Sequence, residues 1–234
     1  MRINFSTAKP TFNSITAQIV YPAPPKLIKK YTKAPMKLIS ETEELWRKIT
    51  KPYTESIPKS EWKWIYNILD EDAEAEKTFF KDKDKSTGFT LCLDLDAGSD
   101  VKETFHCLAL VERRDVLSIR DLNASHLPLL RKLAGKGLDE VSRRFEVPKE
   151  EIRAYFHYHP SFYHLHLHYS HVELLEYGVT TERAHLISDV IQNIEMVGDY
   201  YQRVTLDFPI RTTNVLFEVV EKEATKLGLK IFRQ

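Results

Sequence analysis

Three histidines alternate with leucines in one short run, His-Leu-His-Leu-His at residues 164–168. Side chains on a β-strand alternate between the two faces of a sheet, so this spacing predicts a strand that carries all three imidazoles on one face. A second run at residues 155–159 repeats the alternation, and residues 160–162 (Pro-Ser-Phe) are suited to turning the chain between the two runs. The pattern therefore predicts two neighbouring strands that gather histidines at one place.

Apolar periodicity elsewhere predicts further elements. Alternating residues indicate strands at Phe89–Leu95, which we expect to be half-buried, at Thr104–Glu112 and at Arg203–Ile210. Helical spacing indicates three helices: Leu127 to Val141, weakened by Gly135 and Gly137; Thr181 through Ala184 to Ile194; and Asn214 to Leu227, with Gly228 as its stop. Because the strands come in neighbouring pairs separated by occasional helices, we expect an α+β fold, a mostly antiparallel sheet with packed helices.

Composition limits the class of protein. Hydrophobic residues make up 42% of the 234, enough for a sizeable core. A formal net charge of zero argues against a surface that coats long nucleic acid, whereas a site for a small anion needs only local charge. Cys92 and Cys107 lie in apolar runs, which favours buried, reduced thiols. With neither an apolar run of membrane-spanning length nor a signal-peptide pattern, we expect a soluble protein of the cytoplasm or the nucleus, without a membrane partner.

The N-terminal segment differs in composition from the remainder. Seven of the eleven prolines fall within residues 1–58, and glycine does not occur in residues 1–87. We therefore expect residues 1–50 to form an arm or small subdomain, and residues 51–234 to form the main domain.

The histidine runs admit four interpretations. They are a polar strand face, solvated or satisfied in the core; a zinc site, since histidines two residues apart can share a metal; a nucleophilic site acting on phosphorus; or a nucleotide-binding pocket with little chemistry. Five histidines in two such runs argue against the first interpretation. The sequence has neither HExxH nor CxxC, which argues against the second. A neutral imidazole is a competent nucleophile near pH 7, so the third needs no metal.

Residues 164–169 resemble the histidine-triad motif of nucleotide hydrolases and transferases. The longer stretch Tyr155–His168 is similar to the scavenger mRNA decapping enzyme family. Three further segments carry the same resemblance: Trp64–Asp70 with Ala73-Glu74-Ala75 after it, Ser118–Leu122, and Glu182–Leu186. The resemblance runs from about Val20 to the C-terminus and implies a histidine-triad fold.

The resemblance implies an activity. Members of that family take part in mRNA decay and hydrolyse the triphosphate bridge of 7-methylguanosine cap dinucleotides and short capped RNA. They release 7-methylguanosine monophosphate through a covalent nucleotidyl-histidine. For this chain the implication is a metal-independent hydrolase of acid anhydrides, a homodimer without a cofactor, whose partner is a cap dinucleotide or short capped RNA.

The resemblance also assigns roles to residues. His166 would be the nucleophile. The phosphate site would comprise His157, Ser161, Phe162, His164, His168 and Arg183. In the cap-base pocket, Trp64 would stack on the base, Glu74 and Asp94 would supply carboxylates, and Leu95 would form the opposite wall. Methylation at N7 makes the guanine cationic, and both an indole face and a carboxylate attract a cation.

Three departures from the family pattern keep a second function open. Asp96 stands where the family has a lysine that helps to hold the phosphates, and Phe162 stands where a tyrosine is usual. The chain also begins partway through the family's N-terminal domain, so residues 1–50 would form only a reduced lid. The alternative is a weakly active or inactive cap-binding regulator that pairs with an active homologue. A generic histidine-triad hydrolase is a third class, and it would not need Trp64, Glu74 and Asp94 together.

Overall fold

The computed structural model describes residues 20–25, 27–28, 34–70, 77–94, 102, 104–174 and 179–233. The chain separates into two compact units, Met1–Ala34 and Pro35–Gln234. Residues 36–50 therefore belong to the second unit, which is the unit described below. The predicted function of the N-terminal segment as an arm or partial lid stays a prediction.

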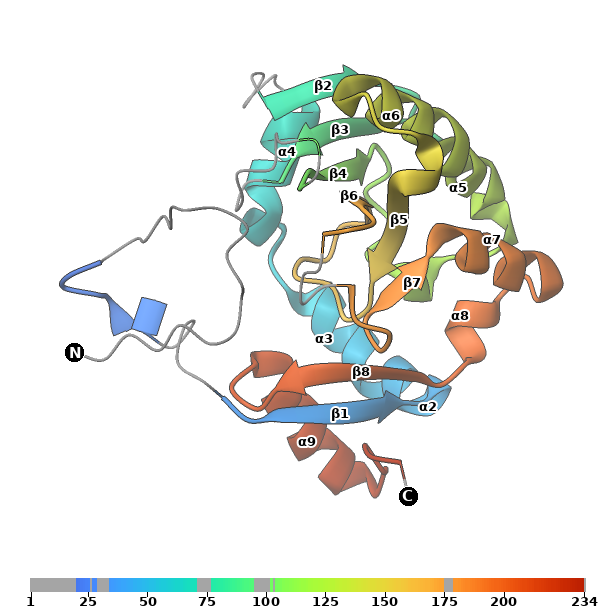
Figure 1. The fold of residues 1–234 in the computed structure, drawn as a ribbon. Helices are drawn as coiled ribbons and strands as arrows, with labels where there is room; N and C mark the ends of the chain where they lie inside the picture. The colour runs from blue at the N-terminus through green and yellow to red at the C-terminus, as the bar shows by residue number, and fades with distance from the viewer. Residues whose placement is uncertain are drawn as a thin grey trace. The chain divides into compact units, whose positions relative to one another are not determined.

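A six-stranded sheet forms the centre of the second unit, in the order β2-β3-β4-β6-β5-β7 (Figure 1). Its strands are β2 (Thr78–Lys81), β3 (Phe89–Leu93), β4 (His106–Val111), β5 (Ile152–His157), β6 (His166–His171) and β7 (Ala184–Leu186). Every neighbouring pair is antiparallel. A separate two-stranded sheet pairs β1 (Met36–Glu41) with β8 (Leu206–Arg211), also antiparallel. The predicted α+β fold with a mostly antiparallel sheet is confirmed.

Helices surround both sheets. The α-helices are α2 (Glu43–Leu45), α3 (Lys51–Ser56), α4 (Lys63–Asp70), α5 (Leu127–Lys132), α6 (Leu138–Phe145), α7 (Ile187–Met196), α8 (Tyr200–Arg203) and α9 (Val215–Leu227). Two π-helical turns, η1 (Trp46–Thr50) and η6 (Leu133–Gly137), join α2 to α3 and α5 to α6. Short 3₁₀ turns are η2 (Lys59–Trp62), η4 (Ile119–Asp121), η5 (Ala124–His126) and η7 (Lys149–Glu151). Among the described residues, no helix combines the length and the apolar character needed to cross a membrane.

The two faces of the large sheet are covered differently. One face presents residues such as Leu91, Ala109 and Leu167 to the main core, which includes Leu133 and Val141 of the helices between residues 127 and 145. The opposite face of β3 and β4 packs through Cys92, Leu108 and Leu110 against Ile65, Ile68 and Leu69 of α4. The strand predicted at Phe89–Leu95 is therefore not half-buried, because α4 covers its second face. Cys92 and Cys107 are both buried and neither forms a disulfide, as predicted.

The predicted helix from Leu127 to Val141 is present but interrupted by the π-helical turn η6. The turn contains both glycines, and Gly137 lies against β6. A Cβ atom at Gly137 would lie 2.2 Å from the hydroxyl of Tyr169, which donates a hydrogen bond to the Leu133 carbonyl at 2.8 Å. Glycine therefore lets this helix approach the sheet closely.

Three predicted boundaries are wrong. Thr181 does not cap a helix: the chain first forms β7, which pairs with β5 at the sheet edge, and α7 begins only at Ile187. The strand predicted from Arg203 begins at Leu206, because Arg203 ends α8. The strand predicted at residues 164–168 begins at His166.

The last predicted helix is confirmed with both of its ends. The side chain of Asn214 accepts a hydrogen bond from the Leu216 amide and caps α9. Gly228 ends the helix in the left-handed conformation, with φ of 66°.

A buried ion pair joins β1 to the segment before α5. Arg120 lies within 2.8 Å of the Glu41 carboxylate, and neither side chain is more than 1% exposed. Arg120 also donates to the carbonyls of Tyr201 and Val204, and the Tyr158 hydroxyl donates to Glu41. Tyr158 directly follows β5, so this network anchors the end of the strand that carries His157.

Candidate active site

Four histidines gather on the face of the sheet that α4 partly covers. Residues two apart on a strand share a face, so His166 and His168 of β6 project on the same side. In the register, His168 pairs with Leu108 of β4 on one side and Tyr155 of β5 on the other. The ring centroids of His157 and His168 are 4.0 Å apart, and those of His106 and His168 are 5.1 Å apart. All four imidazoles are buried. The predicted gathering of histidines by neighbouring strands is therefore present.

His164 lies just before the strand and contributes mainly through its backbone. Its imidazole Nε2 donates a hydrogen bond to the Val111 carbonyl at 2.8 Å. This bond holds the His164 ring outside the histidine cluster. Its carbonyl accepts a hydrogen bond of 2.8 Å from Nδ1 of His166. Strand pairing is replaced here by the hydrogen bond from the Leu165 amide to the Val116 carbonyl.

His166 has the geometry of a nucleophile. A carbonyl only accepts hydrogen bonds, so Nδ1 of His166 carries the proton and Nε2 carries the lone pair. Within the described residues, Nε2 has no hydrogen-bond partner. Burial lowers the pKa of His166 to about 4, so the ring is neutral near pH 7. A neutral imidazole with a fixed tautomer, and a lone pair that no hydrogen bond occupies, can attack phosphorus.

His168 is hydrogen-bonded on its Nδ1 side to a residue that sequence reasoning missed. His106 Nε2 lies 2.9 Å from His168 Nδ1, and His106 Nδ1 lies 3.1 Å from the Asp94 carboxylate. Burial, followed by the nearby His157, holds the pKa of His168 well below its usual range. The signal that could have found His106 was its place in the predicted strand Thr104–Glu112. Its meaning depends on the pairing of β4 with β6, which the sequence does not show.

The predicted phosphate-site residues lie around this cluster. Arg183 approaches the Ser161 hydroxyl at 3.5 Å, and its positive charge is among the influences that lower the pKa of His166. The Arg183 carbonyl accepts a hydrogen bond from the Tyr158 amide, directly after His157. Arg183, Ser161 and His157 are therefore brought together near the two β6 histidines, and their roles toward a phosphate stay predictions.

Only part of the predicted cap-base pocket falls within the described residues. Trp64, on α4, meets Phe162 edge-on with ring centroids 5.2 Å apart, and Phe162 in turn stacks on His166 at 3.9 Å. Asp94 follows β3 and is paired with His106. Glu74, Leu95 and Asp96 lie outside the described residues. The structure thus brings Trp64 and Asp94 to the side of the sheet that carries the histidines.

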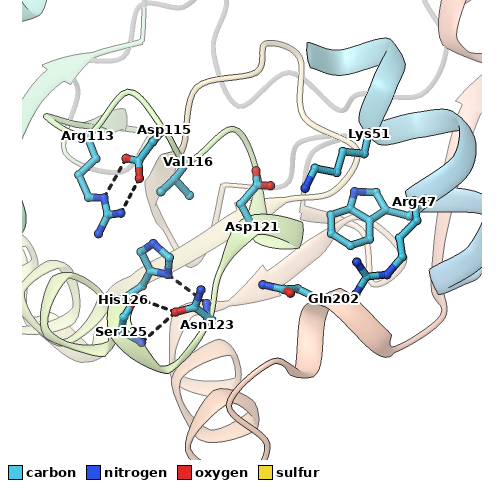
Figure 2. A pocket seen from close by; sticks show the side chains of 11 residues that line it. Arg47, Lys51, Arg113, Asp115, Val116, Asp121, Asn123, Ser125, His126 and Gln202 are labelled. Carbon is cyan, nitrogen blue, oxygen red and sulfur yellow. Dashed lines mark hydrogen bonds and ion pairs between the residues drawn. The ribbon is translucent and has the colours of Figure 1, made fainter.

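A separate pocket of about 320 Å³ contains none of the predicted site residues (Figure 2). It is lined by Trp46, Arg47, Lys51, Arg113, Asp115, Val116, Asp121, Asn123, Ser125, His126 and Gln202. Arg113 is held by both oxygens of Asp115, and Asp121 accepts from two backbone amides. Because Arg113, Asp115 and Asp121 are already hydrogen-bonded within the protein, the histidine cluster is the better candidate for chemistry. Among the described residues, no group of three or more histidine, cysteine or acidic side chains is arranged to hold a metal ion.

An α+β fold whose antiparallel sheet carries His166 and His168 of the run beside a buried tyrosine and two further histidines is that of a histidine-triad protein. The family model described as "Scavenger mRNA decapping enzyme C-term binding" matches residues 63–183. The chain belongs to the scavenger mRNA decapping enzyme family.

Its relatives bear the name m7GpppX diphosphatase. The protein of Rattus norvegicus is 40% identical over 210 residues, which cover 90% of this chain and 62% of the relative. That of Ascaris suum is 39% identical over 206 residues, 88% of this chain and 68% of the relative. That of Schizosaccharomyces pombe is 34% identical over 209 residues, which cover 89% of this chain and 69% of the relative. The chain thus spans about 62% of the length of the rat relative.

A weaker likeness, from which nothing about function follows, is to a solved chain titled "Hnt3 in complex with DNA and guanosine". Its TM-score is 0.40 and its sequence identity is 17%, over 70% of this chain and 96% of that chain.

Proposed function

We propose that this protein hydrolyses the triphosphate bridge of 7-methylguanosine cap dinucleotides and short capped RNA, and releases 7-methylguanosine monophosphate. The observation that carries the proposal is the state of His166. Its Nδ1 donates to the His164 carbonyl, while its Nε2 has no hydrogen-bond partner among the described residues. The relatives' name, m7GpppX diphosphatase, supports a cap substrate for a nucleophile of this kind.

The proposed reaction has two steps. In the first, Nε2 of His166 attacks the phosphorus next to methylguanosine, the P–O bond to the rest of the bridge breaks, and the diphosphate product leaves with the electron pair. In the second, water attacks the same phosphorus, the P–N bond breaks, and its electrons return to His166. Because Nε2 already carries a lone pair, the first step needs no base to activate His166.

The negative charge on the phosphates must be stabilised by groups fixed in advance. Arg183 supplies a cation near Ser161, and the His157 ring lies beside His168. Donors held in place by a buried network stabilise developing charge without reorganisation. We propose that these residues hold the phosphates and that the reaction requires no metal.

We propose that Trp64 recognises the methylated base by stacking. The cationic guanine is attracted to an indole face. Trp64 lies two ring contacts from His166, through Phe162, which is compatible with a base bound beside the reacting phosphate. Glu74, Asp94 and Leu95 complete the proposed pocket by their match to the family pattern.

The remaining proposals concern partners. We propose that the protein acts as a homodimer on short capped fragments, in the cytoplasm or the nucleus. A net charge of zero supports a short substrate over long nucleic acid.

The test is hydrolysis of methylated and unmethylated cap dinucleotide by purified protein in excess chelator. We expect release of 7-methylguanosine monophosphate, a strong preference for the methylated substrate, and loss of that preference in Trp64→Ala. Turnover without any preference would indicate a generic dinucleotide hydrolase. Tight cap binding without turnover would overturn the hydrolase proposal and assign the protein to the regulators.

A further inference from the structure

Asp94, His106 and His168 form a hydrogen-bonded chain that ends inside the candidate active site. His106 Nδ1 lies 3.1 Å from Oδ2 of Asp94, and His106 Nε2 lies 2.9 Å from Nδ1 of His168. The two imidazoles lie nearly parallel, with planes 26° apart. The Asp94 side chain is 25% exposed, whereas that of His106 is only 7% exposed. The chain therefore leads from the rim of the site to its buried centre.

The chain determines which nitrogen of His168 carries the proton. A carboxylate only accepts hydrogen bonds, so Nδ1 of His106 carries a proton. In neutral His106, Nε2 is then an acceptor, and the hydrogen it shares with His168 belongs to Nδ1 of His168. This leaves the lone pair of His168 on Nε2, which has no hydrogen-bond partner among the described residues. The centroid of its ring lies 5.0 Å from that of His166.

The other groups that face His168 do not favour a positive charge there. Tyr155 of β5 stacks on it, and His157 of the same strand packs at 4.0 Å. His166 neighbours it on β6, and after burial, which has the largest effect, positive charge on His157, His166, His106 or Arg183 lowers the pKa of His168. Asp94 supplies the opposite charge, relayed through His106.

We propose that Asp94 and His106 are positioning residues that hold His168 ready to accept a proton at Nε2 in the second step of the reaction. The inference rests on the proposed function and deepens it. Water gives a proton to Nε2 of His168 as its oxygen attacks phosphorus, and the P–N bond electrons return to His166. The imidazolium of His168 is stabilised through His106 by the Asp94 carboxylate, and it later releases the proton to solvent. The relation parallels that of carboxylate and imidazole in a serine-protease triad.

The contact with His106 gives Asp94 a second proposed role. Matching to the family pattern makes it a cap-base carboxylate, whereas the structure shows one of its oxygens paired with His106. Asp94 would then serve both in recognising the base and, through His106, in positioning His168 to accept a proton.

The first test uses no substrate. Protein labelled with ¹⁵N at histidine is titrated by NMR as the wild type, His106→Phe and Asp94→Asn. We expect wild-type His168 to carry its proton on Nδ1, and His106→Phe to move it to Nε2. We also expect Asp94→Asn to lower the titration midpoint of His168 further, because it removes the negative charge that stabilises the imidazolium through His106. An unchanged tautomer and midpoint in both variants would overturn the proposal.

His171→Phe is the matched control. His171 is a buried histidine at the end of the same strand, and its Nδ1 accepts from the Glu173 amide. The control should leave the tautomer and midpoint of His168 unchanged. If thermal unfolding shows that His106→Phe is not folded, Asp94→Asn still tests the proposal. The Asp94 side chain is partly exposed, and its change to Asn removes the charge with little change in volume.

The second test separates the two steps kinetically with methylated cap dinucleotide. We expect His106→Phe to form the covalent intermediate at close to the wild-type rate and to hydrolyse it about tenfold to a hundredfold more slowly, which is typical of a weakened general base. Equal slowing of both steps would contradict the proposal and indicate a structural role. A wild-type protein with no turnover would overturn the proposed function alone, and the NMR titration would still decide the state of His168.

Discussion

The ring of Phe162 lies flat on the imidazole of His166, with centroids 3.9 Å apart and planes 22° apart. The chain departs from the family pattern at this position, where a phenylalanine replaces the usual tyrosine. The ring of Trp64 contacts that of Phe162 edge-on, with ring centroids 5.2 Å apart. Phe162 therefore shields the proposed nucleophile from water and links it to the proposed base pocket.

Removing this cover should change the nucleophile's protonation. In Phe162→Ala, water gains access to His166, whose pKa is lowered to about 4 mainly by burial. We expect the pKa to rise toward the ordinary value for histidine, and kcat/KM to fall about tenfold or more at mildly acidic pH. NMR titration of His166 and a pH series of initial rates measure the two effects. Phe162→Tyr keeps the ring and is the control; an unchanged pKa in Phe162→Ala would contradict the shielding.

Four histidines with lowered pKa values predict a pH-dependent stability. Burial lowers the pKa of His159 to about 3 and those of His164, His166 and His185 to about 4. Unfolded histidines titrate near pH 6.5, so between about pH 6.5 and pH 4 the unfolded chain binds more protons than the folded one. The free energy of unfolding should therefore fall as the pH falls through this window, because protonation of these histidines favours the unfolded chain. Urea unfolding across the window measures it, and a flat profile there would show that these rings are not held neutral.

The buried ion pair of Arg120 and Glu41 should matter far more than an exposed one. Arg120→Met leaves the Glu41 carboxylate uncompensated in the core, and we expect a loss of about 3–5 kcal/mol in the free energy of unfolding. The control is Arg47→Met, which breaks a pair of similar length, 2.9 Å, whose side chains are 51% and 43% exposed. That loss should stay below about 1 kcal/mol. Similar losses in the two variants would contradict the difference in burial.

Much of the fold follows from local patterns. The strand β3 is predicted by apolar alternation within a few residues. The helix α9 is predicted by its apolar spacing and by Asn214 and Gly228 at its ends. Local patterns do not predict β1, β2 or β7 as strands, and for β1 and β2 the reason lies in their burial. β1 buries only its last three residues, and β2 is a four-residue edge strand without a fully buried position. Neither therefore shows a strong apolar alternation.

The site could be predicted only in part, because its geometry depends on contacts between distant segments. The histidine run indicates His166 and His168, but His106 joins them through a pairing that spans 62 residues. At His164 a local pattern predicts more strand than the structure has. Its spacing predicts a strand, but hydrogen bonds to Val111 and from Leu165 to Val116 replace strand pairing there.

Two glycines of one π-helical turn should respond in opposite ways to alanine. A Cβ at Gly137 would clash with the buried Tyr169 hydroxyl, whereas a Cβ at Gly135 would meet no atom within 4 Å. We expect Gly137→Ala to destabilise the protein by about 1–3 kcal/mol and Gly135→Ala to stabilise it by about 0.5–1 kcal/mol. Denaturant unfolding of both variants measures the difference. A stabilising Gly137→Ala would mean that the helix does not need this close approach to β6.

The central claim is that His166 forms a covalent bond to the methylguanosine phosphate. The most direct measurement is to mix protein with methylated cap dinucleotide, quench within one turnover, and locate any adduct by mass spectrometry. We predict a 7-methylguanosine monophosphate adduct on His166 that disappears with time, and neither adduct nor product in His166→Ala. Full product release with no adduct on His166, or undiminished turnover by His166→Ala, would contradict the account.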